Sequence, residues 1–186
     1  MSFKRTRAGI AVSLDPEEVA VLGQVIGEMF ELIGVPDPAP DGAKWARDLG
    51  LAGVGELPAA PPDPETDPIR ARLFPAGYRD DEQAASDFRR FTEDELRAGK
   101  AANADALLRS LPEGGGAIVL DEDGCAAWLG ALNDARLALG TALEVDENTS
   151  YELATLEANE PRARRLVVYI WLGELQDSLL EALMEG

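Results

Sequence analysis

Residues 8–34 have the sequence AGIAVSLDPEEVAVLGQVIGEMFELIG, in which a short strand pattern runs directly into a long apolar helix pattern. Residues 8–14 are apolar and include β-branched side chains, which predicts a strand. Asp15 follows as a helix cap, a proline takes the first helical position, and Glu18 completes a capping box. Gly34 ends the pattern, as glycine does at many helix ends.

The helix expected after Asp15 is apolar around much of its circumference, which is typical of a buried helix. One face carries apolar residues at spacings of three and four: Val19, Leu22, Ile26, Met29 and Ile33. A second apolar row lies beside it: Val21, Val25 and Leu32. We therefore expect this helix to pack against several other elements.

The rest of the chain predicts further helices and one more strand. Residues 117–120, AIVL, are expected to pair with residues 8–14 as a two-stranded ribbon. Helices are expected over residues 69–111 in two or three pieces, 124–143 and 161–184, whereas residues 144–158 are ambiguous. Within the first of these, residues 80–90 form one piece and Thr92 opens another with its own capping box.

These elements predict a mainly α (α+β) fold, a helical bundle with a small two-stranded β ribbon. The length of 186 residues suits a single domain over residues 1–186, and 46% hydrophobic residues lie in the globular range. Proline is concentrated in a loop at about residues 35–68.

No membrane segment is expected. The longest apolar run, LVVYIWL at residues 166–172, is far shorter than the roughly 20 residues of a spanning helix. The first residues mix basic and acidic side chains without a long apolar stretch, so we expect no secretory signal. The cytoplasm is therefore the expected location.

The net charge of −18, from 35 acidic and 17 basic residues, limits the choice of partners. Such a chain repels nucleic-acid phosphates and anionic membranes at long range, and attracts basic protein surfaces. We expect the chain alone to bind DNA only weakly.

Catalytic chemistry has no support in the sequence. The chain has no histidine, which removes the commonest general base and a common metal ligand, and its serines lack a triad partner. The acidic run that begins at Asp121 resembles a calcium loop, but Ala127 and Leu132 stand where ligands are needed, so a solvated helix start is the better interpretation. We expect no enzyme activity, no cofactor and no metal.

Cys125 is the only cysteine, and two interpretations of it stay open. A helix N-terminus favours its thiolate, whereas the neighbouring carboxylates disfavour it. Cys125 is therefore a redox candidate, but it also shares a helical row with Leu129 and Leu132, which is typical of a small core residue.

A mixed-charge block holds the candidates for partner binding: Tyr78, Arg89, Arg90, Arg97 and Lys100. Its two helical pieces resemble a helix-turn-helix, but three consecutive acids from residue 93 to 95 would face the phosphates. The basic residues would instead dock an acidic patch on a partner, or pair with neighbouring acids within the chain.

Residues 71–112, ARLFPAGYRDDEQAASDFRRFTEDELRAGKAANADALLRSLP, resemble the signature of the actinobacterial AosR-like oxidative-stress transcriptional regulator family. The family was formerly a domain of unknown function, encoded near a ClpS-type adaptor. The strand and LDPEE helix start and the apolar closing helix agree with it. The resemblance extends over nearly the whole chain, and is weakest in the Pro-rich loop.

The resemblance implies regulation of redox-responsive transcription, with an extracytoplasmic-function sigma factor as a partner. A family member senses oxidant through a cysteine pair, which this chain, with one cysteine, lacks. The leading hypothesis is a redox-linked transcriptional regulator that acts through contacts with a sigma factor or RNA polymerase. The alternative is an adaptor in regulated proteolysis.

A homodimer is a further prediction. The run at residues 166–172 has more apolar residues nearby, and together they exceed what one face of a small domain usually buries. These additional residues are Leu175, Leu179, Leu180 and Leu183.

Overall fold

A computed structural model describes residues 2–34, 67–75 and 82–185, and only the backbone over residues 82–91. Its elements in chain order are β1 (Lys4–Thr6), β2 (Gly9–Leu14), α1 (Pro16–Ile33), α3 (Pro68–Leu73), α4 (Glu82–Ser110), β3 (Gly116–Leu120), α5 (Glu122–Ala142), α6 (Thr149–Thr155) and α7 (Pro161–Met184). The fold is mainly helical with a small antiparallel sheet, which confirms the predicted class. The Pro-rich loop predicted at 35–68 lies outside the described residues except for its last two positions, and the single-domain assignment stays a prediction.

The sheet has three strands in the order β1-β2-β3. The expected ribbon of two strands was therefore incomplete, because a third strand, β1, pairs with β2. The predicted pairing of β2 with β3 is confirmed, with Val12 opposite Ile118. β1 was missed because its three residues, KRT, carry no apolar alternation. The inward residues of β2 and β3, such as Ile10 and Leu120, are buried in the core.

α1 begins with the predicted capping box. The Glu18 backbone N–H donates to Asp15 Oδ1 over 2.8 Å, and the Asp15 N–H donates to Glu18 Oε2 over 2.8 Å. These bonds satisfy N–H groups that a helix start leaves without a partner. The predicted face of α1 is buried at Leu22, Ile26, Met29 and Ile33.

α4 is one continuous helix, so the predicted break and new start at Thr92 are wrong. The Thr92 and Glu95 spacing matches a capping box, but no glycine or proline lies between residues 82 and 98 to interrupt the helix. α4 also packs against α1 and α5, and such tertiary contacts stabilise a helix. A local capping pattern is therefore insufficient evidence for a helix start inside a helix-forming stretch.

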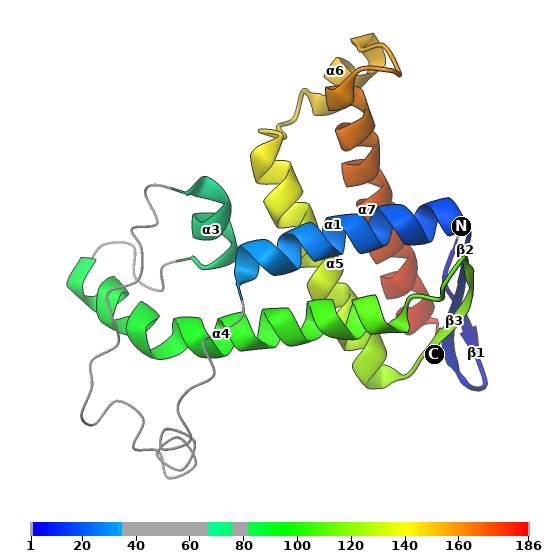
Figure 1. Cartoon of the computed structure of the whole chain (residues 1–186), viewed down its shortest axis with the longest axis horizontal. Coiled ribbons are helices and arrows are strands. Elements are labelled where there is room, and N and C mark those ends of the chain that lie inside the picture. Colours follow the sequence, from blue (N-terminus) through cyan, green and yellow to red (C-terminus); the bar gives the residue numbers. More distant parts are fainter. Residues whose placement is uncertain (1, 35–66, 76–81, 186) are drawn as a thin grey trace.

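α5 lies at the centre of the bundle and contacts α1, α3, α4 and α7. In Figure 1, α1 and α4 run side by side, and α5 and α7 cross them. The Trp128 side chain is fully buried on α5, lies edge-to-face against Phe3 with ring centroids 5.7 Å apart, and donates from Nε1 to Ser110 Oγ over 2.9 Å. The helical bundle and the sheet therefore share one hydrophobic core, which includes Trp128.

The helices at the carboxyl side agree closely with the sequence patterns. α5 starts two residues before the expected position, with Asp121 as its cap, and α7 matches the predicted range. The ambiguous segment contains the short helix α6, which an ion pair between Glu152 and Arg162 joins to the start of α7. Among the described helices, none combines the length and apolar character that a membrane crossing requires.

Candidate protein-interaction surface

The predicted partner-binding residues are spread over different parts of the chain. Tyr78 lies outside the described residues. Arg89 and Arg90 lie on α4, where only the backbone is described. For Arg97 and Lys100, also on α4, the structure gives the side-chain contacts with other described residues.

Arg97 is used inside the fold. Its Nη1 donates to the Ile33 carbonyl over 2.8 Å, and its guanidinium lies 5.1 Å from the centre of the Phe74 ring. It also pairs with Glu93, which in turn bonds Arg70 over 3.2 Å. Arg97 therefore joins the end of α1 to α3 and α4, and its side chain is only 13% exposed.

Lys100 is also paired within the chain. Its Nζ lies 2.5 Å from Asp134 Oδ1, and the Asp134 side chain on α5 is only 4% exposed. A buried carboxylate needs such a partner, because an unpaired charge in the core is costly. Both residues follow the alternative in which the basic residues of this block pair with acids of the chain, and partner binding through the block stays a prediction.

Cys125 has the surroundings of a core residue. It lies in the first turn of α5 and is 2% exposed. Burial raises the pKa of the Cys125 thiol, the charges of Asp121 and Glu122 raise it further, and Arg5 opposes them. A buried, protonated thiol reacts slowly with oxidants, because the thiolate is the reactive form.

The acidic run before Cys125 is a helix start, as expected. Asp121 Oδ1 accepts the Gly124 backbone N–H over 2.8 Å, and Glu122 and Asp123 occupy the first turn, where negative charge favours the helix dipole. Within the part of the chain that the structure describes, no three acidic or cysteine side chains are grouped so that they could hold a metal ion.

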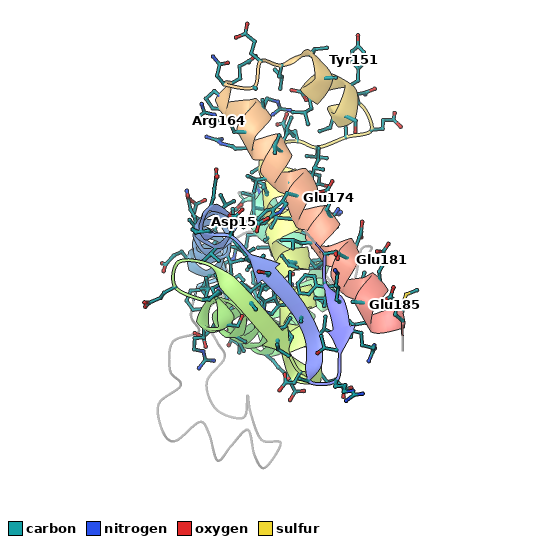
Figure 2. The ribbon with its side chains drawn as sticks, turned by 90° about the vertical axis from the view of Figure 1, so that its right-hand side faces the viewer. Asp15, Tyr151, Arg164, Glu174, Glu181 and Glu185 are labelled. Carbon is teal, nitrogen blue, oxygen red and sulfur yellow. The ribbon has the colours of Figure 1, made fainter. Side chains whose placement is uncertain are left out.

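The exposed side of α7 is a surface that the sequence analysis missed. The apolar side chains of Val167, Ile170, Leu180 and Met184 are 55%, 37%, 40% and 80% exposed. Acidic side chains are exposed along the same helix: Glu174, Asp177, Glu181 and Glu185. Figure 2 shows three of them, Glu174, Glu181 and Glu185, following one another along α7. A helical wheel of the expected helix would have found this side, had the acids been plotted with the apolar residues.

Part of the apolar surplus behind the homodimer prediction is buried within the chain. Leu166, Leu172, Leu175 and Leu179 are at most 2% exposed and face the interior. Val167, Ile170 and Leu180 of this set remain exposed. The homodimer stays a prediction, with less surface available to it than the sequence indicated.

The charges along α7 are placed against its own dipole. Arginines stand in its first turn, and no basic residue stands in its last. Arg5 of β1 compensates from outside the helix, since its Nη2 donates to the Leu183 carbonyl over 2.8 Å and its Nε to the Ala182 carbonyl over 3.3 Å. Glu174, Asp177 and Glu181 on the rest of α7 are exposed, and among the described residues none of them forms an ion pair.

Comparison with known proteins assigns the chain to a family. Residues 1–183 match the family described as "Domain of unknown function (DUF2017)". The chain belongs to this family. The match includes every described helix and strand except the last residue of α7.

Curated relatives of this DUF2017 chain have regulatory names. The "Oxidative stress regulator AosR" of Mycobacterium bovis and that of Mycobacterium tuberculosis are each 33% identical to it, over 92% of this chain and 81% of theirs. The "Putative oxidative stress regulator AosR" of Mycobacterium leprae is 32% identical over 91% of this chain and 80% of its own. No solved structure matches the chain significantly. The names agree with the resemblance found in the sequence and support a regulatory role.

Proposed function

We propose that this chain is a redox-linked transcriptional regulator that acts mainly through protein–protein contacts with the transcription machinery. The partner would be a sigma factor or RNA polymerase in the cytoplasm, and the chain would perform no enzymatic step. The names of its relatives support the regulatory part of the proposal. Charge and exposure support the part that concerns protein contacts.

The exposed carboxylates carry the proposal. The chain has a net charge of −18, and basic side chains such as Arg97 and Lys100 are engaged inside the fold. With 35 acidic and 17 basic residues, the chain presents a strongly anionic surface. Such a surface is repelled by DNA phosphates and attracted to basic protein surfaces, which favours protein contacts over direct DNA reading.

The redox link is supported by the relatives' names and not by Cys125. That thiol is buried and its pKa is raised, so it is poorly placed to react first with an oxidant. In this proposal the oxidant acts on the partner, or on the complex, and the chain responds by binding or releasing it.

A binding experiment with purified components tests the proposal. The full chain is immobilised, and RNA polymerase core and individual sigma factors are passed over it in reducing and in oxidising buffer. We expect one of them to bind, with an affinity that differs between the two buffers. The Cys125→Ala variant should behave like the original chain in both buffers.

Two results would overturn the proposal. One is the absence of binding to polymerase and to every sigma factor in both buffers. The other is tight, sequence-selective binding of duplex DNA by the chain alone at about 0.15 M salt, where phosphate repulsion should prevent it. Binding to a Clp chaperone instead of polymerase would favour the alternative of an adaptor in regulated proteolysis.

A further inference from the structure

α7 presents a regular row of six residues to solvent, which we call the α7 seam. Its members are Val167, Ile170, Glu174, Asp177, Glu181 and Met184, and all six are exposed. They are separated by three, four, three, four and three positions, the spacing by which one helix meets another in a coiled coil. At 1.5 Å per residue the α7 seam is about 25 Å long, enough for a partner helix of four to five turns.

The opposite side of α7 already has its partners. Leu172, Leu175 and Leu179 are buried, and α7 packs on α5, β1 and β2. Among the described residues, these packed elements lie on the buried side of α7, and the seam side is left to solvent (Figure 2). The α7 seam is thus a second helix face with helix-pairing spacing.

The order of side chains along the α7 seam is specific. Apolar residues occupy both ends, with Val167 and Ile170 at one end and Met184 at the other. Three carboxylates occupy the centre: Glu174, Asp177 and Glu181. In the described part of the chain the ion pairs use other acids, namely Glu93, Asp105, Asp134 and Glu152. The charges at the centre of the seam are therefore available to a partner.

We propose that the α7 seam binds a cationic amphipathic helix of a partner protein. That helix would place lysine or arginine opposite the three carboxylates and apolar side chains opposite the two ends. Charge complementarity gives it direction and specificity, and the apolar ends remove water at both limits of the contact. This inference rests on the proposed function and specifies the chemistry of its partner.

A second copy of this chain does not fit the α7 seam. In an antiparallel pair related by a two-fold axis, Glu174 would face Asp177 of the other copy, and Ile170 would face Glu181. In a parallel pair each carboxylate would lie beside its own counterpart. Like charges at helix-pairing positions repel, and each chain also carries a net charge of −18. The seam thus favours a basic partner over self-association.

A synthetic helix provides a direct test with the full chain. The probe is a labelled peptide of about 21 residues, or six helical turns, with lysine at three central seam-spaced positions and leucine outside them. Its binding is measured by fluorescence anisotropy against the original chain and against Glu174→Gln/Asp177→Asn/Glu181→Gln. A control variant, Glu31→Gln/Asp94→Asn/Glu95→Gln, removes the same number of exposed charges from α1 and α4.

We expect the seam variant to bind the probe at least about tenfold more weakly, and the control variant to lose less than about threefold. A peptide with glutamate in place of lysine should not bind the original chain. Replacing Ile170 and Met184 by alanine should also weaken binding, which bulk charge alone does not explain. Equal losses in the seam and control variants, or no loss in either, would overturn the inference.

The same variants separate this inference from the proposed function. If the original chain binds a sigma factor or polymerase and the seam variant binds it equally well, the seam inference fails while the function stands. If the probe binds through the seam but neither sigma factor nor polymerase binds the chain, the function fails while the seam stands. Circular dichroism of each variant checks that the fold is retained.

Discussion

Arg97 shows how a single charged residue becomes part of the core. Its guanidinium bonds the last carbonyl of α1, lies over Phe74 and pairs with Glu93. Each contact uses a different part of the group, so the charge is satisfied although little of it reaches solvent. Cys125 is the opposite case, a side chain that is 2% exposed and whose pKa is raised by burial and by nearby acids.

Replacing Arg97 by alanine should lower the free energy of unfolding by about 2–3 kcal/mol, because three contacts are lost and Glu93 loses one of its two cations. Urea unfolding followed by circular dichroism measures this change. Arg109→Ala is the control, since the ion pair of Arg109 with Asp105 is exposed and is worth at most about 0.5 kcal/mol. Similar losses in both variants would contradict the role assigned to Arg97.

The Cys125 thiol should be alkylated by iodoacetamide only slowly in the native protein. Because its pKa is raised above the ordinary value of 9.0, the pH at half-maximal rate should lie above 9.0 in the native state and near it in urea. Native stability that depends on this proton is present below pH 9.0 and is lost as the pH rises through the folded pKa. Fast alkylation at pH 7 would instead favour the sensor interpretation.

At the scale of elements, α7 depends on the other end of the chain. It has no basic residue in its last turn, and Arg5 of β1 bonds the carbonyls of Ala182 and Leu183 in its place. The Phe3 backbone N–H also donates to Ser178 Oγ over 2.8 Å. The short strand β1 therefore has a second role beside its pairing with β2, since it also holds the end of α7.

Replacing Arg5 by alanine should loosen the last turn of α7 and cost about 1 kcal/mol, because two carbonyl bonds and a favourable charge at the helix end are lost. Hydrogen exchange should accelerate in the amides of residues 181–184, with little change in α1. The exposed Arg7, two residues away, supplies the control Arg7→Ala. Unchanged exchange at the end of α7 would show that Arg5 is dispensable there.

At the scale of the whole molecule, the balance of charge and the bonds that the positive side chains form determine which partners the chain attracts. The chain has 17 basic residues against 35 acidic ones, and Arg5, Arg70, Arg97 and Lys100 all bond other parts of the fold. The acids Glu93 and Asp134 are taken up in the same ion pairs, so the fold uses charges of both signs and the large excess of acids remains. Contacts with a basic partner should therefore weaken as salt is added.

Changing the three central seam carboxylates, Glu174, Asp177 and Glu181, to leucine should create a continuous apolar seam and make α7 self-associate. Removing the repulsion leaves the spacing of an antiparallel coiled coil. Light scattering should then give about twice the mass of the original chain's species at equal concentration. The variant with leucine at Glu31, Asp94 and Glu95 should keep the original mass, and a rise in that variant as well would indicate nonspecific association.

Much of the fold follows from local patterns. Asp15 and Glu18 lie close in sequence, so the start of α1 was predictable, as were the limits of α7 from its proline and its apolar period. The three-residue strand β1 could not be predicted, because it lacks an alternating apolar pattern. The unbroken helix α4 could not be predicted either, because the spacing of Thr92 and Glu95 falsely indicates a helix start. The ion pair of Lys100 could not be predicted from the sequence either, because its partner Asp134 lies on another helix.

The amino-acid sequence by itself determined the helical class, the pairing of two strands, the excess of negative charge and the family resemblance, because these depend on composition and on residues close together in the chain. Only the tertiary structure decided which charges remain free, which side of α7 faces solvent, and that Cys125 is enclosed. Those outcomes depend on contacts between residues far apart in sequence, and the spacing of apolar residues along the chain does not predict such contacts.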